Sequence, residues 1–267
     1  MREELLAKPE ETLIGHTSRV CQMADVLTKM LPQDVQRMLR CTELDIDHWK
    51  KAVWLGAWLH DCGKANDHFQ KMMRNPSFRQ GVRHETLSLV LVHELDDWLK
   101  PVWSDLPQWA KCSVLFTASG HHLKFPDPLE DKRQGTKVTV YLAHKDFAGL
   151  LRLGSERFVE LSEIPPLINK EYSLGPRGSL AKVLTSLQRE LYFDFTDQEK
   201  ALIATVKVTV MACDLAGSAL PLKVADPAGW LIRSSRSGFK RGRLEKGRRE
   251  PHWDIFATTF PGAGTRG

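Results

Sequence analysis

Apolar residues recur at helical spacing along most of the chain. The positions between His16 and Pro32 follow this spacing, and they predict one helix that ends at Pro32. The same spacing predicts further helices over residues 84–99, 107–119, 179–193 and 197–220. We therefore expect a mainly α fold.

The segment from Trp49 to Lys64, WKKAVWLGAWLHDCGK, is apolar on nearly all sides. A helix of this kind is buried in a core instead of lying on a surface. We predict a central buried helix that ends at His60 and Asp61, with Gly63 as its C-terminal stop. A catalytic pair is expected at that end.

Residues 133–147 fit two patterns. KVTVYLA has the β-branched residues typical of a strand, whereas the following LAHKDFAGLLRL has the spacing of a helix. Both interpretations remain open, and the first would add a small β-hairpin insertion to the helical domain.

Composition divides the chain into two parts. A chain of 267 residues, 42% of them hydrophobic, is long enough for one large core, which we place in a domain over residues 1–225. Residues 226–267 form a basic tail or linker that contains Gly and Ser, as in IRSSRSGFKRGRLEKGRRE. Such a tail is either a solvated segment or an arm that contacts phosphate. The formal net charge of +5 slightly favours an anionic partner.

The cysteines and the apolar segments indicate a compartment. Five scattered cysteines form no Cys-x-x-Cys pair, and an odd number cannot all pair within one chain. We therefore expect a reducing cytoplasm. The first residues lack the apolar stretch of a signal peptide, and we expect no later segment to approach the length of a membrane span.

Candidate metal ligands accompany the predicted helices. His60 and Asp61 stand in LHDCGK at a helix end, where adjacent side chains most easily share a site. The other candidates are His16, His84, His121, His122 and Asp214. Seven ligands are too many for one tetrahedral zinc, but they suit two metals that share a carboxylate. Any one histidine taken alone is more often a core or surface residue.

The motifs H, HDxGK, HExxS, GHH and DxxxS follow one another in this order from His16 to Ser218. This order resembles the HD nuclease domain of the type I CRISPR interference nuclease and helicase. The resemblance implies an HD-superfamily helical domain with a dinuclear metal site.

By this resemblance, the two metals have separate ligand sets that share Asp61 as a bridge. The ligands of one metal would be His16, His60, Asp61 and Asp214, and those of the other would be Asp61, His84, His121 and His122.

Lys64 and Ser218 would join Asp61 as catalytic residues. Lys64 would neutralise phosphate, and Ser218 would orient a phosphate or a ligand. The alternative interpretation of Lys64 is a surface lysine. That of Ser218 is a serine whose hydroxyl hydrogen-bonds to the backbone of its own helix.

The histidine-rich set indicates divalent transition metals. Mn, Fe, Co and Ni are the ions we expect first, with Zn and Mg as further candidates, because imidazole suits transition metals better than Mg. Metal-bound hydroxide would be the nucleophile.

The resemblance implies a nuclease that cleaves single-stranded DNA in CRISPR interference, as an endonuclease, with exonuclease action as a further option. Its partners would be a helicase, fused or separate, and a guide-RNA surveillance complex. The helicase is counted as a partner because the chain has no Walker A motif of its own. Two alternatives stay open. One is an HD phosphohydrolase of nucleotides or cyclic nucleotides, and the other is a non-catalytic HD scaffold that binds nucleic acid or protein.

Overall fold

Helices account for most of the residues that the computed structural model describes, which are 3–120, 137–161, 163–175, 177–190, 194–219 and 227. The fold is mainly α, as the sequence predicts. The helices are α1 (Leu13–Met30), α2 (Pro32–Leu39), α3 (Glu43–Leu59), the short 3₁₀ helix η1 (Cys62–Lys64), α4 (Asp67–Arg74), α5 (His84–Glu94), α6 (Asp96–Trp103), α7 (Gln108–Gly120), α8 (Lys145–Arg157), α9 (Ser179–Glu190) and α10 (Asp197–Ala219). Two small antiparallel strand pairs accompany them, β1 (Leu6–Lys8) with β2 (Glu11–Thr12), and β3 (Lys137–Val140) with β4 (Lys170–Ser173).

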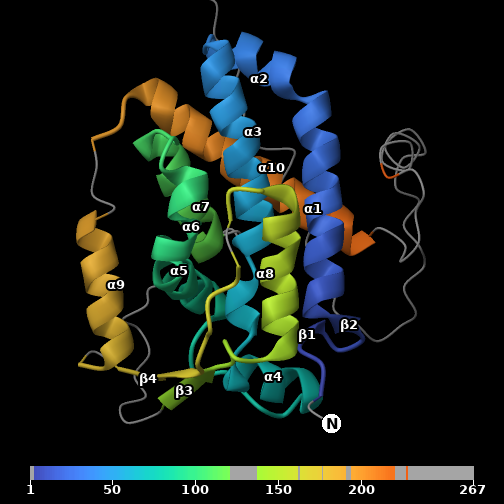
Figure 1. Cartoon of the computed structure of the whole chain (residues 1–267), viewed down its shortest axis with the longest axis vertical. Coiled ribbons are helices and arrows are strands. Elements are labelled where there is room, and N and C mark those ends of the chain that lie inside the picture. The colour runs from blue at the N-terminus through green and yellow to red at the C-terminus, as the bar shows by residue number, and fades with distance from the viewer. Residues whose placement is uncertain are drawn as a thin grey trace, which may run out of the picture. The chain divides into compact units, whose positions relative to one another are not determined.

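The centre of the helical domain is α3, which contacts α1, α7 and α10 (Figure 1). The two indole side chains of Trp49 and Trp58 are fully buried on it, as are Val53, Leu55 and Leu59. Thr42 begins the helix with a capping box that pairs it with Asp45. The prediction of a central buried helix is therefore confirmed, although it begins at Glu43, earlier than expected.

Several other elements agree with the sequence predictions. Helix α1 covers the segment between His16 and Pro32 and begins three residues earlier, where the Thr12 hydroxyl accepts a hydrogen bond from the Gly15 backbone amide. Helices α7, α9 and α10 lie where the apolar spacing placed them, although residues 191–193 and 220 lie outside the described residues.

Two local predictions were wrong. The expected helix over 84–99 is two helices, because the backbone leaves helical geometry at Leu95 and α6 then begins with the acidic first turn of Asp96 and Asp97. The helix predicted to end at Pro32 does end there, with Met30 as the last residue of α1, and Pro32 then opens α2 as its first residue. Gly63 is not a left-handed helix stop, since it lies inside η1, where its lack of a side chain serves close packing.

The two interpretations of residues 133–147 each hold for one part of that segment. Residues 137–140 form β3, and α8 begins at Lys145. The partner of β3 is β4, thirty residues later in the chain, so this strand pair is joined through α8 and is not a tight hairpin. Residues 133–136 lie outside the described part.

The expectation that no segment has the length and apolar composition of a membrane span was wrong by that test. Among the described residues, α10 is long and apolar enough to pass that test. A core helix of a soluble protein passes it as well, and α10 packs against α1, α3 and α7. Length and composition alone therefore decide nothing about a membrane.

All five cysteines are buried and free of disulfides, as expected from their number and spacing. The boundary between residues 225 and 226 stays a prediction, because nearly all of the proposed tail lies outside the described residues.

Gly154 of α8 provides a test of the core packing. A Cβ atom at this position would lie 2.1 Å from the Trp58 ring, and that ring cannot turn aside easily because its Nε1 donates a 2.7 Å hydrogen bond to the Leu150 carbonyl. We expect Gly154→Ala to lower the free energy of unfolding by about 1–3 kcal/mol, measured by urea denaturation.

Gly149→Ala is the matched control on the same helix. Its Cβ would meet the side chain of Ile14, with the terminal methyl nearest at 2.7 Å, and a methyl at the end of a flexible side chain can move. Because both changes gain the same helix propensity, their difference isolates the clash with Trp58. Equal stability of the two variants would contradict this packing account.

Candidate metal centre

The candidate centre begins where α3 ends. His60 is the C-cap of α3 and keeps helical backbone angles, whereas Asp61 leaves the helix with φ −109° and ψ 5°. This change of direction lets two adjacent side chains face the same point, which they would not do on an uninterrupted helix. Both side chains are buried, with exposed fractions of 0% for His60 and 1% for Asp61.

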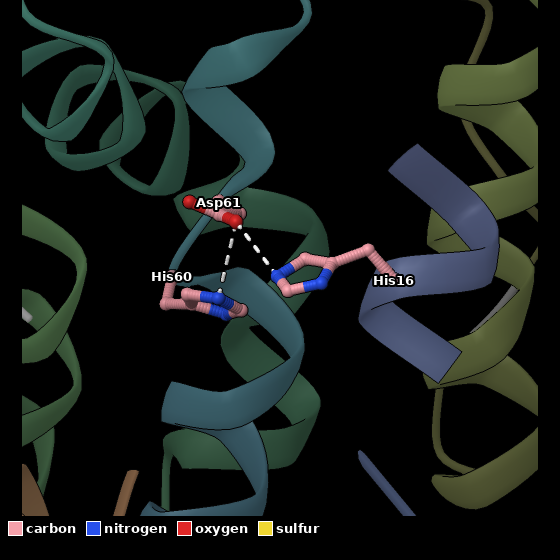
Figure 2. A group of neighbouring side chains, drawn as sticks. All are labelled: His16, His60 and Asp61. Atoms are coloured by element: carbon pink, nitrogen blue, oxygen red, sulfur yellow. Dashed lines mark ion pairs between the residues drawn. The ribbon is translucent and has the colours of Figure 1, made fainter. Parts of the chain in front are cut away.

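Asp61 lies at the meeting point of three imidazoles. Its Oδ2 atom is 3.1 Å from His16 Nε2 and 3.2 Å from His60 Nε2, as Figure 2 shows. Its Oδ1 atom is 3.2 Å from His84 Nε2. Oδ2 of this carboxylate therefore faces two histidines, from α1 and from the end of α3, and Oδ1 faces one histidine, from α5.

The Nδ1 atom of each of these histidines faces an oxygen on the outside of the cluster. His16 Nδ1 is 3.0 Å from Glu11 Oε1, His60 Nδ1 is 2.8 Å from the Ala57 carbonyl, and His84 Nδ1 is 3.3 Å from Glu85 Oε2. An acceptor at Nδ1 fixes the ring and leaves the Nε2 lone pair for a metal.

Helix α10 brings Asp214 to the same centre. Asp214 Oδ1 is 3.2 Å from His16 Nε2, and its side chain is one-quarter exposed. The Ser218 hydroxyl donates to Asp214 Oδ1 at 3.3 Å and accepts from Lys8 Nζ at 2.7 Å. Ser218 thus contacts a candidate ligand, and among the described ligands Asp214 is the most exposed to solvent.

Lys64 contacts Asp61 directly. Its Nζ lies 2.6 Å from Asp61 Oδ2, and the residue is 8% exposed. The alternative interpretation of Lys64 as a surface residue is therefore wrong. Its predicted contact with phosphate stays a prediction, since the ammonium here neutralises the central carboxylate.

The turn that carries Asp61 is fixed by hydrogen bonds from its neighbours. The Gly63 amide donates to Ser88 Oγ of α5 at 2.9 Å, and the Asn66 amide group donates to the Gly63 carbonyl at 2.6 Å. The Gln70 side chain donates to the Lys64 carbonyl at 2.9 Å. The first of these bonds joins η1 to α5, the helix that begins with His84, and the other two fix η1 to the start of α4.

The electrostatics of the cluster favour bound cations. Burial alone would lower the pKa of His16, but hydrogen bonds with Asp214, Asp61 and Glu11 outweigh it and raise the pKa from 6.5 to about 10. Burial alone would raise the pKa of Asp61, but the charges of His60 and Lys64 hold it well below its usual value. The pKa of Asp214 is also lowered, chiefly by its hydrogen bond with His16 against the opposing effect of burial. A proton on His16 thus joins two carboxylates, in the position that a metal ion would occupy.

The residues present fit a divalent metal ion. One donor atom from each of His16, His60 and Asp61 lies within 4.8 Å of the others, and all three residues are buried. Imidazole nitrogen combined with carboxylate oxygen is a donor set for transition metals. The cluster could therefore hold a metal ion of this class.

The structure brings together five of the seven predicted ligands, which are His16, His60, Asp61, His84 and Asp214. His121 and His122 lie outside the described residues, so their role stays a prediction. They follow directly after α7, which ends at Gly120 and contacts α3, α5 and α10.

Sequence reasoning did not find the outer partners of the histidines. Glu11 precedes His16 by five residues on a different element, and nothing in its spacing marks it. Glu85 directly follows His84. The opposite charges of Arg83 and Glu85, two positions apart, could have indicated that Glu85 is held beside His84. Arg83 donates to Glu85 at 2.6 Å, and although burial alone would raise the pKa of Glu85, this hydrogen bond lowers it to about 2.

A separate cavity of about 730 Å³ lies outside the cluster. Its lining includes Leu5, Arg74, Phe78, Tyr141 and His144, and none of the candidate ligands. The cluster is thus identified by its donor atoms and their burial, not by cavity size.

Over most of its length the chain matches known proteins. The family model described as the HD domain of Cas3 matches residues 6–218. A protein of Myxococcus xanthus (strain DK1622), named "Putative CRISPR-associated nuclease/helicase Cas3", is 31% identical over 238 residues, which are 84% of this chain and 31% of the relative. The chain thus spans about a third of that relative's length. The solved CRISPR-associated Cas3 HD domain protein of Methanocaldococcus jannaschii is 20% identical, with a TM-score of 0.43 over 79% of this chain and 98% of that one.

Gly63 tests whether close packing of η1 on α5 builds the cluster. A Cβ atom at Gly63 would lie 2.1 Å from the His84 carbonyl oxygen and 2.3 Å from the Ser88 backbone nitrogen. Because backbone atoms cannot turn aside, Gly63→Ala must push α5 away from Asp61. We expect weaker Mn²⁺ binding by titration calorimetry and a loss of about 1–3 kcal/mol in stability.

Gly81→Ala is the control for the change of residue type. Its Cβ would approach the His68 ring no closer than 3.2 Å, so it should leave Mn²⁺ affinity unchanged. Unaltered Mn²⁺ affinity in the Gly63 variant would show that this contact does not position His84.

Proposed function

The chain belongs to the Cas3 HD domain family, and on that premise we propose that it is a metal-dependent nuclease that hydrolyses phosphodiester bonds of single-stranded DNA in CRISPR interference. The observation that carries this proposal is the arrangement around Asp61. A fully buried carboxylate that faces three imidazoles, with a second carboxylate on the same nitrogen of His16, gathers donor atoms of the kind that bind divalent transition metals. Metal-dependent hydrolysis of a phosphodiester would use these donor atoms to bind the metal ions.

The proposed centre holds two divalent metal ions. One would be held by His16, His60, Asp61 and Asp214, through the Asp61 oxygen that already faces both imidazoles. The other would be held by Asp61, His84, His121 and His122. Oδ1 of Asp61 faces His84, whereas Oδ2 faces His16 and His60. This difference supports the division of the ligands into two sets. The number of ions and their identity, with Mn, Fe, Co and Ni favoured over Zn and Mg, are part of the proposal.

The metals would lower the pKa of a bound water and polarise a phosphate oxygen. The residues of the chain would orient the reactants around them. Within the described part of the chain, the exposed edge formed by Asp214 and Ser218 is the side from which a phosphate would approach. Lys64, beside Asp61, would place a positive charge where negative charge develops on that phosphate.

The proposed substrate and partners follow from the family. The Myxococcus xanthus relative is named a nuclease/helicase, and this chain matches 31% of it. We therefore propose a helicase partner, fused or separate, that delivers single-stranded DNA after a guide-RNA surveillance complex has exposed it. The five free cysteines are consistent with a cytoplasmic location, which we also propose.

Cleavage of circular single-stranded DNA tests the proposed function. The full chain is stripped of metal and refilled separately with Mn²⁺, Ni²⁺, Co²⁺, Fe²⁺, Zn²⁺ or Mg²⁺. We expect at least one transition metal to open the circle, which requires an endonuclease because a circle has no ends. Asp61→Ala should lower the rate by about 100-fold or more, because the metals contribute several kcal/mol to the transition state.

Two controls separate the proposal from its alternatives. Asp47→Ala removes a surface carboxylate that pairs only with Lys50 among the contacts described, and it should cleave normally. A deoxynucleoside monophosphate is offered in parallel. Hydrolysis of the mononucleotide with an intact circle would favour a small-substrate phosphohydrolase, and no hydrolysis of either would favour a non-catalytic scaffold.

A further inference from the structure

The β1–β2 pair brings one carboxylate to the outer side of His16. Glu11 lies on β2, directly before the Thr12 cap of α1, and its Oε1 atom is 3.0 Å from His16 Nδ1. The opposite nitrogen of the same ring, Nε2, faces Asp61 and Asp214. His16 is therefore held between one carboxylate on its outer side and two on its inner side.

Two cations fix the position of Glu11. Arg19, one turn after His16 on α1, contacts Glu11 Oε1 through its Nη2, and Lys8 Nζ lies 3.2 Å from Glu11 Oε2. Both oxygens of the carboxylate are thus engaged. Glu11 is partly buried, so solvent competes little for these contacts.

The same two cations reach the helix that carries Asp214. Arg19 Nε donates to the Gly217 carbonyl at 3.1 Å, and Lys8 Nζ donates to the Ser218 hydroxyl at 2.7 Å. Ser218 in turn donates to Asp214. Glu11 is thus the shared acceptor of a network that joins β1, β2, α1 and α10 around two candidate ligands.

A carboxylate at Nδ1 has a definite effect on a metal-binding histidine. When Nδ1–H donates to it, the tautomer is fixed with the Nε2 lone pair free, the ring cannot rotate, and the nitrogen becomes more basic. The Nδ1 atom of His60 faces the Ala57 carbonyl at 2.8 Å, and that of His84 faces the Glu85 carboxylate at 3.3 Å. The carboxylate that faces His16 is itself held by two cations, Lys8 and Arg19.

We propose that Glu11 is a positioning residue of the metal centre, which sets the tautomer, orientation and basicity of His16 and couples them to Asp214 through Lys8, Arg19 and Ser218. This inference rests on the proposed metal centre and adds a residue outside its ligand set. Glu11 acts through His16 and does not touch metal or substrate.

A purely structural role for Glu11 makes a different prediction. If the carboxylate only fastened the β1–β2 pair to α10, its removal would lower the stability of the metal-free protein and leave the metal affinity of the folded protein unchanged. A positioning role weakens the metal affinity of molecules that are still folded. Affinity measured well below the unfolding temperature therefore separates the two roles.

The test uses Mn²⁺ titration calorimetry and Co²⁺ absorption spectra of the full metal-free chain. We expect Glu11→Ala to weaken Mn²⁺ binding about 10–100-fold and to change the Co²⁺ ligand-field spectrum. Glu11→Gln keeps an oxygen that accepts from Nδ1–H, so it should recover most of the affinity, to within roughly tenfold of the unsubstituted chain. Glu94→Gln is the matched control, because this carboxylate pairs with Lys170 and Tyr172 at the opposite end of α5 from His84.

The outcomes separate this inference from the metal centre itself. Tight Mn²⁺ binding by the unsubstituted chain together with equal affinity and an equal Co²⁺ spectrum in folded Glu11→Ala would overturn the inference alone. An equal loss of affinity in Glu11→Ala and Glu94→Gln would also overturn it, because the effect would then be global. No Mn²⁺ binding by the unsubstituted chain would overturn the proposed centre and the inference with it.

Discussion

The complete burial of the Asp61 carboxylate is the constraint on which the rest of the structure depends. A charge removed from water is strongly destabilising unless each of its oxygens has a partner. The fold supplies these partners from separate elements, His16 from α1, His60 and Lys64 from the end of α3 and from η1, and His84 from α5. The helical domain is therefore arranged so that three helix termini meet at one carboxylate.

Close packing keeps those termini in place. Gly63 allows η1 to approach the α5 backbone more closely than any side chain would permit, and Trp58 of α3 fills the space beside Gly154 of α8. The outer acceptors on the Nδ1 atoms then fix each ring, so that the Nε2 atoms converge before any ion binds. Preorganisation of this kind lowers the cost of binding a metal and a phosphate, because little needs to move.

Much of this arrangement could be predicted from the sequence, since its signals are local. The all-round apolar segment before His60 identifies α3, and the order of the motifs identifies five ligands that do meet. The division of residues 84–99 into α5 and α6 depends on backbone angles at Leu95, which apolar spacing does not report. The roles of Gly63 and Glu11 depend on contacts with α5 and His16, and a pattern along one chain does not reveal which element lies opposite.

The most direct test of the account is to locate Mn²⁺ in crystals of the full chain by anomalous scattering. The account predicts a peak about 2 Å from an Asp61 carboxylate oxygen and from the Nε2 atoms of His16 and His60, with their Nδ1 contacts retained. A Mn²⁺ ion bound elsewhere at saturating concentration, with Asp61 still enclosed by the imidazoles and Lys64, would contradict it.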